Sequence, residues 1–340
     1  MSRTAAEIEA ARAPRVVYGH DILRGVAAGL GRFAVMTMAE PWQLAREQLH
    51  GAAAVHMVTS MDRAVVEQAE AALPAVDAVI GLGGGSAVDM AKYVTWRRGA
   101  RLVLAPTIVS VDAAVTNTVG VRDDGHVRYI GFVVADTVAV DFSVIAQAPP
   151  ALNRAGIGDI LSIHTGCWDW QLADSRAGMP YDRHIATQAL ALVDSLEQRA
   201  AEIRGLGDDA LRFIMQSYVA ENDLCLQAGT SQPEEGSEHF WAYNLEYRTG
   251  RHFVHGELIC LGVLLMARLQ ENEPERVLAI VENTGVRYHP VDLGITRDEM
   301  RSSLRTLRAY VESERLTRSV IDERRIDELV LERLTDGLLF

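Results

Sequence analysis

The sequence is poor in cysteine, in long apolar runs and in positive charge, and each shortage excludes a class of protein. The three cysteines, Cys167, Cys225 and Cys260, lie far apart and include no CxxC pair, so neither a disulfide framework nor a zinc knuckle is supported. The longest apolar run of the second half, residues 258–267, is too short to span a bilayer. The formal net charge of -13, with scattered Lys and Arg, argues against a nucleic-acid partner.

The N-terminus also lacks the basic-then-apolar pattern of a secretory signal. Together with the scarce cysteine, this favours a reducing, cytoplasmic location away from membranes. The chain has 340 residues, of which 49% are hydrophobic and 23% charged, as is ordinary for a globular protein with room for two domains.

In the first half, short β-branched runs alternate with amphipathic stretches. Strands are expected at 16–18, 33–38, 54–58, 78–82, 101–106 and 137–141, and helices at 22–30, 41–49, 61–73 and from 86 onward. This alternation predicts an α/β fold with a Rossmann-like parallel sheet, whose ligands bind at the carboxyl ends of the strands. Residues 115–121 and 127–134, joined by a turn with Asp-Asp-Gly, predict a β-hairpin.

The second half has helical periodicity throughout. Helices are expected at 154–173, 185–203, 210–228, 237–248, 256–270, 274–284, 297–313 and 322–334, while the charged stretch 317–325 is interpreted as a solvated loop and helix face. Pro149-Pro150 marks the expected boundary between a dinucleotide-binding domain, residues 1–150, and an all-helical metal and substrate domain, residues 151–340. The active site is expected in the cleft between them.

A glycine cluster between an expected strand and helix is the most informative stretch of the first half. In residues 77–92, DAVIGLGGGSAVDMAK, the chain turns through Gly83, Gly84 and Gly85 into a helix that begins at Ser86. Such a turn directs unpaired N–H groups and the positive end of the helix dipole toward one point, where a phosphate binds. A turn without a ligand fits the same residues equally well.

Three residues of the helical half could bind a metal. Asp159, His239 and His255 supply one carboxylate and two imidazoles, which is a reasonable donor set for Zn²⁺ or Fe²⁺ with a position left for water or substrate. Spacing alone does not bring them together, and a histidine is more often a surface or core residue than a ligand.

The combined motifs resemble the iron-containing alcohol dehydrogenase superfamily. GGGSAVDMAK at 83–92, APTIVSVD at 105–112, AGIGD at 155–159 and the two histidine contexts occur in that family's order. Within it the chain looks most like the glycerol-1-phosphate dehydrogenase branch, and glycerol dehydrogenase and 3-dehydroquinate synthase are more distant relatives. The resemblance extends from about residue 16 to about residue 270.

The resemblance implies roles for particular residues. The cofactor pyrophosphate would be held by Gly83, Gly84, Gly85, Ser86 and Ala87. The nicotinamide side would be lined by Thr107, Ser110 and Thr116. Asp112 would contact the substrate hydroxyls, although an Asp near a strand end is also a common turn residue. The metal would be bound by Asp159, His239 and His255, and would assist loss of the hydroxyl proton before hydride transfer to the nicotinamide.

One position departs from the branch pattern. The phosphate-substrate branch typically places a second histidine one helical turn after the first metal histidine, where it contacts substrate, and Tyr243 stands there in this chain. A phenol donates a hydrogen bond but carries no positive charge for a phosphate. We therefore hypothesise a different polyol, hydroxy-aldehyde or phosphorylated analogue as substrate. Packing of Tyr243 in the helical core is the plainer alternative.

The residue that binds the cofactor ribose is expected to follow an earlier strand than it does in an ordinary dinucleotide-binding fold. The stretch that follows Lys92 offers arginines and no convincing acid, whereas in this superfamily the reader follows the second strand, where Glu40 stands. A carboxylate there would bind the ribose hydroxyls and repel a 2′-phosphate, favouring NAD over NADP. Glu40 could equally be a favourable charge at a helix N-terminus.

The resulting hypothesis is a metal-dependent, NAD(P)-linked dehydrogenase of a small polyol, a hydroxy-aldehyde or ketone, or a polyol phosphate. The alternative is a sugar-phosphate cyclase resembling 3-dehydroquinate synthase, with transient NAD redox; Asp159, where cyclases typically have Glu, speaks against it. A non-catalytic binding protein of the same fold is the third possibility, although it would be free to lose the ligands. Zn²⁺ is the first choice of metal, with Fe²⁺ or Ni²⁺ as alternatives, and the family suggests a homo-oligomer.

Overall fold

The computed structural model describes residues 14–340, so the N-terminal stretch examined for a secretory signal lies outside the described residues. The chain divides into two compact units, Met1–Asn153 and Arg154–Phe340. Each has its own buried core.

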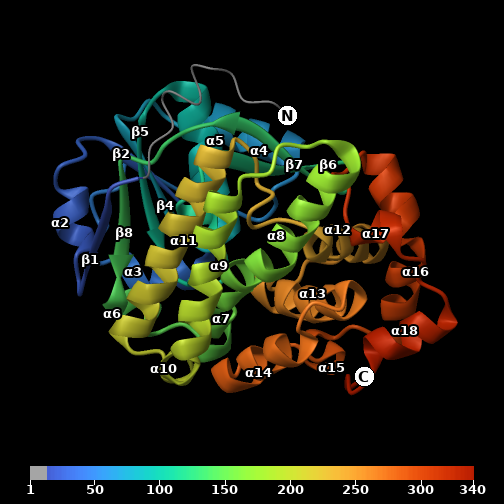
Figure 1. The fold of residues 1–340 in the computed structure, drawn as a ribbon. Coiled ribbons are helices and arrows are strands. Elements are labelled where there is room, and N and C mark those ends of the chain that lie inside the picture. Colours follow the sequence, from blue (N-terminus) through green and yellow to red (C-terminus); the bar gives the residue numbers. More distant parts are fainter. Residues whose placement is uncertain (1–13) are drawn as a thin grey trace. The chain divides into compact units, whose positions relative to one another are not determined.

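A six-stranded parallel sheet forms the centre of the first unit (Figure 1). The strand order is β1-β8-β5-β4-β2-β3, and every pairing is parallel. The strands are β1 (Val16–Gly19), β2 (Phe33–Thr37), β3 (Ala54–Met57), β4 (Ala78–Gly83), β5 (Arg101–Pro106) and β8 (Thr137–Asp141). Because β2 and β4 are buried along their whole length, they appear in the sequence as continuous apolar runs. The predicted α/β class is thereby confirmed.

The helices of this unit follow the strands closely. They are α2 (Leu23–Ala27), α3 (Ala39–Ala45), α4 (Arg63–Ala72), α5 (Gly85–Arg98) and α6 (Phe142–Ile145), and α7 (Pro150–Arg154) lies at the division between the units. The first is shorter than the predicted 22–30, because it stops at Ala27 ahead of Gly29 and of Gly31, which has a φ of +68°. Gly81 of β4 lets α5 pack closely on the sheet, since a Cβ there would lie 2.8 Å from the Ala91 Cβ.

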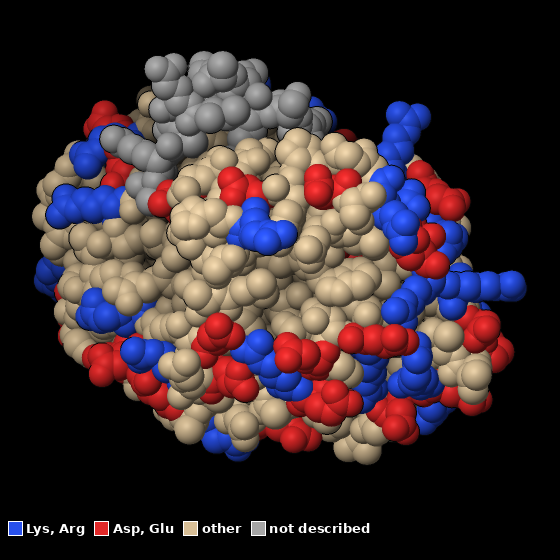
Figure 2. Space-filling view, viewed as in Figure 1, with Lys and Arg blue, Asp and Glu red and all other residues tan. Residues whose placement is uncertain are grey.

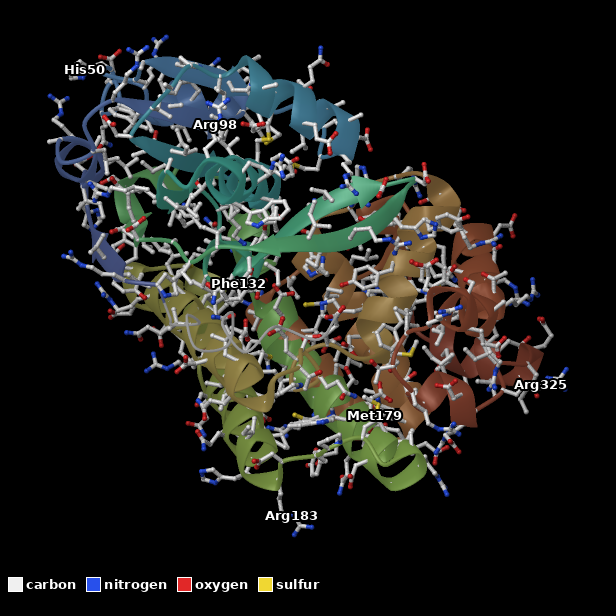
Figure 3. The ribbon with its side chains drawn as sticks, turned by 90° about the horizontal axis from the view of Figure 1, so that it is seen from above. His50, Arg98, Phe132, Met179, Arg183 and Arg325 are labelled. Atoms are coloured by element: carbon white, nitrogen blue, oxygen red, sulfur yellow. The ribbon has the colours of Figure 1, made fainter. Side chains whose placement is uncertain are left out.

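The predicted hairpin is present as β6 (Thr118–Asp123) and β7 (His126–Phe132), paired antiparallel. Figure 3 shows it as a pair of long arrows, with Phe132 labelled at the end of β7. It packs on α5 through Gly131, since a Cβ on Gly131 would lie 2.5 Å from the Trp96 ring.

Arg98, which is labelled in Figure 3, connects the end of α5 to the end of α4. Its side chain donates to the carbonyls of Leu73 (3.0 Å) and Pro74 (2.9 Å).

The second unit is helical throughout, as predicted (Figure 1). Its helices are α8 (Ile157–Ala177), α9 (Arg183–Gln198), α10 (Ala200–Gly205), α11 (Asp208–Ala228), α12 (Ser237–Thr249), α13 (His255–Gln270), α14 (Pro274–Thr284), α15 (Pro290–Leu293), α16 (Arg297–Glu314), α17 (Val320–Glu323) and α18 (Glu328–Thr335).

Two predicted helices of this unit are each divided in the structure. The helix expected at 185–203 breaks at Arg199, where φ is -100° and ψ is 7°, and a new helix then buries Ala200 and Ile203. The one expected at 322–334 breaks at Arg324, whose backbone is extended. The solvated-loop interpretation of 317–325 is wrong for Ser319, Val320 and Ile321, which are buried. Ser319 and Asp322 form a capping box that starts α17 there.

Among residues 14–340, no helix is both long and apolar enough to cross a membrane. On the face drawn in Figure 2, basic and acidic side chains are interspersed.

Candidate active site

The three predicted metal ligands meet in the second unit, each at the beginning of a helix. Asp159 lies in the first turn of α8, His239 is the third residue of α12, and His255 is the first residue of α13. One ligand atom from each lies within 4.8 Å of those of the other two. The His255 Nε2 is 3.1 Å from the Asp159 Oδ1. A carboxylate and two imidazoles this close fit a four-coordinate divalent cation with one further position for substrate.

A pair of glycines lets two of the ligand-bearing helices approach. A Cβ on Gly158 would lie 2.5 Å from the Cα of Gly256, which is closer than real Cβ contacts come. Gly158 precedes Asp159 and Gly256 follows His255. The first turns of α8 and α13 therefore touch backbone to backbone, and this contact brings the carboxylate and the imidazole together.

The side chain of Glu238 orients the His239 ring. Its Oε1 is 2.9 Å from the His239 Nδ1 and also accepts from the Gly236 N–H at 2.6 Å, while its Oε2 accepts from the Thr165 hydroxyl at 2.7 Å. Glu238 is fully buried. A carboxylate acceptor at Nδ1 favours the tautomer with its proton there, which would leave Nε2 available to a metal.

The same carboxylates set the proton affinity of His239. Burial acts to lower the pKa of His239, but the hydrogen bond to Glu238 and the charges of Glu238, Glu235 and Asp159 outweigh it and raise the pKa to about 9. Deeper in the unit, burial and the charge of Glu238 raise the pKa of Asp169 to about 7. Because a metal competes with the ligand proton, occupancy of the site must weaken as the pH falls.

Tyr243 lies beside His239, as the one-turn spacing predicted. The two ring centroids are 6.0 Å apart, and the Tyr243 hydroxyl donates to the Glu235 Oε1 at 2.7 Å. Tyr243 and Glu235 are both half-buried.

The glycine turn of the first unit ends β4 and starts α5. Gly83 has a φ of +152°, and a Cβ on it would lie 2.8 Å from the Ala87 methyl group. A Cβ on Gly84 would lie 2.9 Å from the Ile108 side chain. The backbone therefore restricts Gly83 to glycine, whereas a side chain at Gly84 would require the Ile108 side chain to move. Helix α5 has no side-chain N-cap, although the Gly84 carbonyl accepts from the N–H groups of Ala87 and Val88, both at 3.1 Å.

The other residues predicted to contact the cofactor surround this turn. Thr107 N donates to the Gly83 carbonyl at 3.2 Å, which joins the ends of β5 and β4. Thr107 and Ser110 are buried, Ser86 is exposed, and the side chain of Ala87 is fully buried, so only its backbone faces the turn.

Glu40 lies in the first turn of α3, which follows β2. Since β2 pairs with β4 in parallel, Glu40 and the glycine turn stand at the same edge of the sheet. Pro41, the third residue of α3, comes within 3.8 Å of the Cβ position of Gly83. Glu40 itself is exposed.

Thr116 and Asp112 follow the turn in the segment before the hairpin. Lys92 of α5 is fully buried and donates to the Thr116 hydroxyl and to the Thr118 carbonyl, both at 3.1 Å. It also pairs with Asp89 at 3.4 Å. Asp112 begins the short 3-10 helix η1 (Asp112–Ala114) and is buried. Lys92 thus fixes the position of Thr116 against α5.

Comparison with known proteins shows the family of the chain. Residues 29–149 match the model described as iron-containing alcohol dehydrogenase. A protein named glycerol-1-phosphate dehydrogenase [NAD(P)+] from Pyrobaculum aerophilum is 34% identical over 68% of this chain and 70% of its own length. The chain belongs to the iron-containing alcohol dehydrogenase family. The expectation of a dehydrogenase of this superfamily is thereby confirmed.

Further comparisons within the family agree over most of the chain. The glycerol-1-phosphate dehydrogenase [NAD(P)+] of Hyperthermus butylicus is 28% identical over 87% of both chains. A crystal structure of glycerol dehydrogenase from Schizosaccharomyces pombe superposes with a TM-score of 0.73 at 18% identity, covering 95% of this chain and 88% of the other. At that identity the likeness shows the fold alone.

Sequence reasoning missed three residues that shape these sites: Glu235, Glu238 and Lys92. Glu238 directly precedes a candidate ligand, and an acid beside a ligand histidine is a signal for an orienting carboxylate. Lys92 sits among the apolar residues of α5, and a lysine at a buried helix position needs partners. Nothing in the sequence alone singled out Glu235.

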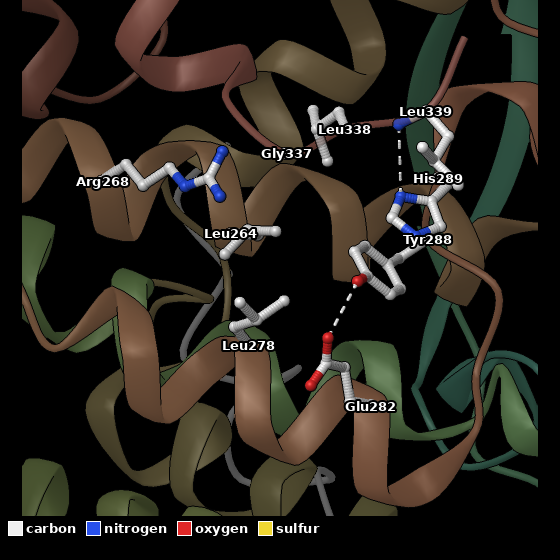
Figure 4. Close-up of a pocket in the computed structure, with 9 residues that line it drawn as sticks. All are labelled: Leu264, Arg268, Leu278, Glu282, Tyr288, His289, Gly337, Leu338 and Leu339. Atoms are coloured by element: carbon white, nitrogen blue, oxygen red, sulfur yellow. Dashed lines mark hydrogen bonds between the residues drawn. The ribbon is translucent and has the colours of Figure 1, made fainter.

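A separate pocket of about 230 Å³ in the second unit contains none of the predicted site residues (Figure 4). It is lined by residues of α13, of α14, of the connection between α14 and α15, and of the C-terminal segment, including Arg268, Glu282, Tyr288 and His289. Its nearest residue on α13, Leu264, is nine residues beyond His255, or about 14 Å along the helix. We therefore place the candidate active site at the metal ligands and not in this pocket.

Proposed function

We propose that the protein is a metal-dependent, NAD(P)-linked dehydrogenase that acts on a small polyol, a hydroxy-aldehyde or ketone, or a polyol phosphate. The single observation that carries the proposal is the gathering of the Asp159, His239 and His255 ligand atoms within 4.8 Å. Relatives named glycerol-1-phosphate dehydrogenase [NAD(P)+] support the reaction class.

In this proposal, different residues bind the metal, the substrate and the cofactor. Asp159, His239 and His255 hold the metal, Tyr243 and Asp112 contact the substrate, and the glycine turn holds the cofactor pyrophosphate. When bound, the metal supplies a Lewis acid for the substrate hydroxyl, and the nicotinamide supplies the hydride acceptor. The protein itself contributes orientation and keeps each charge in place.

The finer assignments belong to the same proposal. Zn²⁺ suits the donor set best, and Fe²⁺ or Ni²⁺ can occupy the same ligands. Glu40 favours NAD over NADP, because its carboxylate stands at the sheet edge that carries the glycine turn. The three cysteines are buried and form no disulfide among the described residues, which suits a cytoplasmic enzyme. We propose that it assembles as a homo-oligomer, as the resemblance suggests.

A substrate screen tests the function directly. The purified protein is incubated with NAD or NADP and a panel of polyols and their phosphates, and absorbance of the reduced nicotinamide is followed with and without a chelator. Stoichiometric, chelator-sensitive reduction is expected, whereas a cyclase would regenerate its cofactor in each turnover.

A histidine variant and its control complete the test. His255→Ala should abolish both the bound metal and the activity. His252→Ala should leave both unchanged, since the His252 side chain is 63% exposed and its nearest charged partner is Glu246, 4.0 Å away. A metal content unaffected by His255→Ala would overturn the proposal.

A further inference from the structure

Beside the metal ligands lies a carboxylate and phenol pair, Glu235 and Tyr243. We infer that this pair is a specificity determinant that selects an uncharged polyol or hydroxy-carbonyl substrate and disfavours a phosphorylated one. The inference rests on the proposed dehydrogenase function and names its substrate class.

The segment that carries Glu235 is held firmly against α8. The Ser162 hydroxyl lies 2.6 Å from the Glu234 carbonyl and 2.6 Å from the carbonyl of Asp159. The Cys167 thiol is 3.3 Å from the Pro233 carbonyl. A Cβ on Gly166 would lie only 3.0 Å from the Glu234 backbone. The backbone that carries Glu235 is thus held against α8 at Ser162, one helical turn from Asp159, and the Tyr243 hydroxyl holds its carboxylate.

The pair stands beside the ligand histidine without being part of the ligand set. The Tyr243 hydroxyl donates to the Glu235 Oε1 at 2.7 Å, and the Tyr243 and His239 ring centroids are 6.0 Å apart. The charge of Glu235 also acts on His239, alongside that of Asp159. Among the described residues, Glu235 does not join the cluster of ligand atoms formed by Asp159, His239 and His255. In this inference it contacts what the metal binds rather than the metal itself.

The chemistry of the pair suits hydroxyl groups. A substrate hydroxyl can donate to the second oxygen of Glu235 and accept from a neighbouring donor, whereas a phosphate at neutral pH offers acceptors and nearly two negative charges. Phosphate recognition relies on arginine, lysine or helix N–H groups. In the part of the chain that the structure describes, neither Glu235 nor Glu238 forms an ion pair with a lysine or arginine. The half-buried Glu235 carboxylate is thus left to repel a phosphate.

The test compares matched substrates in the metal-loaded protein. Wild type should oxidise glycerol or 1,2-propanediol with a kcat/KM at least 10-fold above that for glycerol 1-phosphate. Glu235→Gln keeps an acceptor for Tyr243 but removes the charge, so the ratio should fall at least 10-fold, mainly through a lower KM for the phosphate. Glu332→Gln, which removes an exposed charge on α18, should leave the ratio unchanged.

Two further measurements keep the inference separable from folding and from activity. Calorimetry should detect tighter binding of inorganic phosphate by Glu235→Gln than by wild type. Tyr243→Phe breaks the hydrogen bond but keeps the charge, so it should raise the KM for the unphosphorylated substrate and retain the discrimination. A wild-type preference for glycerol 1-phosphate, or a ratio unmoved by Glu235→Gln, would overturn the inference while leaving the dehydrogenase intact. Failure of every substrate to reduce the nicotinamide would instead overturn the proposed function.

Discussion

At the scale of single residues, Glu238 shows how one buried carboxylate can orient a candidate metal ligand. It accepts hydrogen bonds from three groups, the His239 ring, the Gly236 N–H and the Thr165 hydroxyl. A buried carboxylate with such partners stays in place, and a fixed acceptor fixes the histidine tautomer. The orientation of the His239 ring therefore depends on a residue outside the candidate ligand set.

Replacing this carboxylate should weaken metal binding. Glu238→Gln keeps the shape but loses the charge that favours the donating Nδ1–H, so the affinity for Zn²⁺ should fall about 10- to 100-fold. The measurement is competition against a chelating dye, with the absorption spectrum of the Co²⁺-loaded protein as a report of ligand geometry. Glu312→Gln, an exposed acid on α16, is the control. Unchanged affinity and spectrum in Glu238→Gln would show that the carboxylate merely packs.

Glu40 is the residue on which the choice of cofactor should depend. Glu40→Ala removes the charge that repels a 2′-phosphate, so the preference for NAD over NADP should drop about 10-fold, or about 1.4 kcal/mol. The ratio of kcat/KM for the two cofactors measures this. Glu47→Ala provides the control, because Glu47 is exposed and lies just beyond the same helix. If the ratio stays the same, Glu40 is only a favourable charge at the start of α3.

The sequence singled out the candidate ligand residues, but not the residues that support them. Asp159, His239 and His255 were found because their residue types and contexts match a family pattern. Glu238 and Glu235 act through burial and distance, which depend on how α8 and the 231–236 segment pack. The sequence places Glu238 next to His239 but does not reveal that its side chain turns back onto Thr165.

At the scale of helices and strands, regular periodicity predicted the elements best where the chain has strong end signals. Strands β5 and β8 and helix α14 begin and end where the pattern places them. Pro106 is the last residue of β5, Pro274 is the first residue of α14, and Gly285 caps the C-terminal end of α14. The break at Arg199 has neither glycine nor proline, and the continuing apolar period hides it. Helix α15, with four residues, is too short to show a period.

The contact between α8 and α13 makes a prediction at this scale. In Gly158→Ala the new methyl group would meet the backbone of Gly256 at 2.5 Å, so the two helices must separate. We expect a loss of about 1–3 kcal/mol in the free energy of unfolding, as for an overpacked core, together with loss of bound metal. Urea denaturation and metal analysis give the two numbers.

Gly205→Ala is the matched control for this substitution. Gly205 ends α10, and a Cβ there has no heavy atom within 4 Å, so stability and metal content should be nearly unchanged. Equal behaviour of the two variants would mean that α8 and α13 can move apart without cost, and the geometric account of the site would be wrong.

At the scale of the whole molecule, the architecture could be predicted from local sequence patterns, whereas the long-range contacts could not. The alternation of strands and helices followed by continuous helix is local, so the two-part α/β and all-helical architecture could be predicted. Asp159 precedes His239 by 80 residues and His255 follows it by 16 on another helix, and no periodicity predicts that the three meet. Only the family resemblance predicted that, and the fold supplies the physical reason through Gly158, Gly256 and Glu238.

The candidate metal-binding residues lie in the second unit, and the candidate cofactor-binding residues lie in the first. Zn²⁺ and NADH should therefore slow amide hydrogen exchange in different segments. Zn²⁺ at about 100 times its Kd adds about 2.7 kcal/mol, which slows by up to about 100-fold those amides that exchange only after the metal leaves. The affected peptides should cover the first turns of α8, α12 and α13. NADH should instead slow exchange in the glycine turn and in residues 105–112. Mass spectrometry of peptic fragments resolves the two patterns.

The histidine variants show whether Zn²⁺ slows exchange by binding at the candidate site or by a general effect on the whole chain. In His255→Ala the effect of Zn²⁺ should vanish while that of NADH persists, and His252→Ala should keep both. Protection by Zn²⁺ that spreads evenly over β4 and β5, or that survives in His255→Ala, would show that the cation binds elsewhere. Protection by NADH that spares the glycine turn would likewise remove the cofactor from that turn, because a bound pyrophosphate must occupy the first N–H groups of α5.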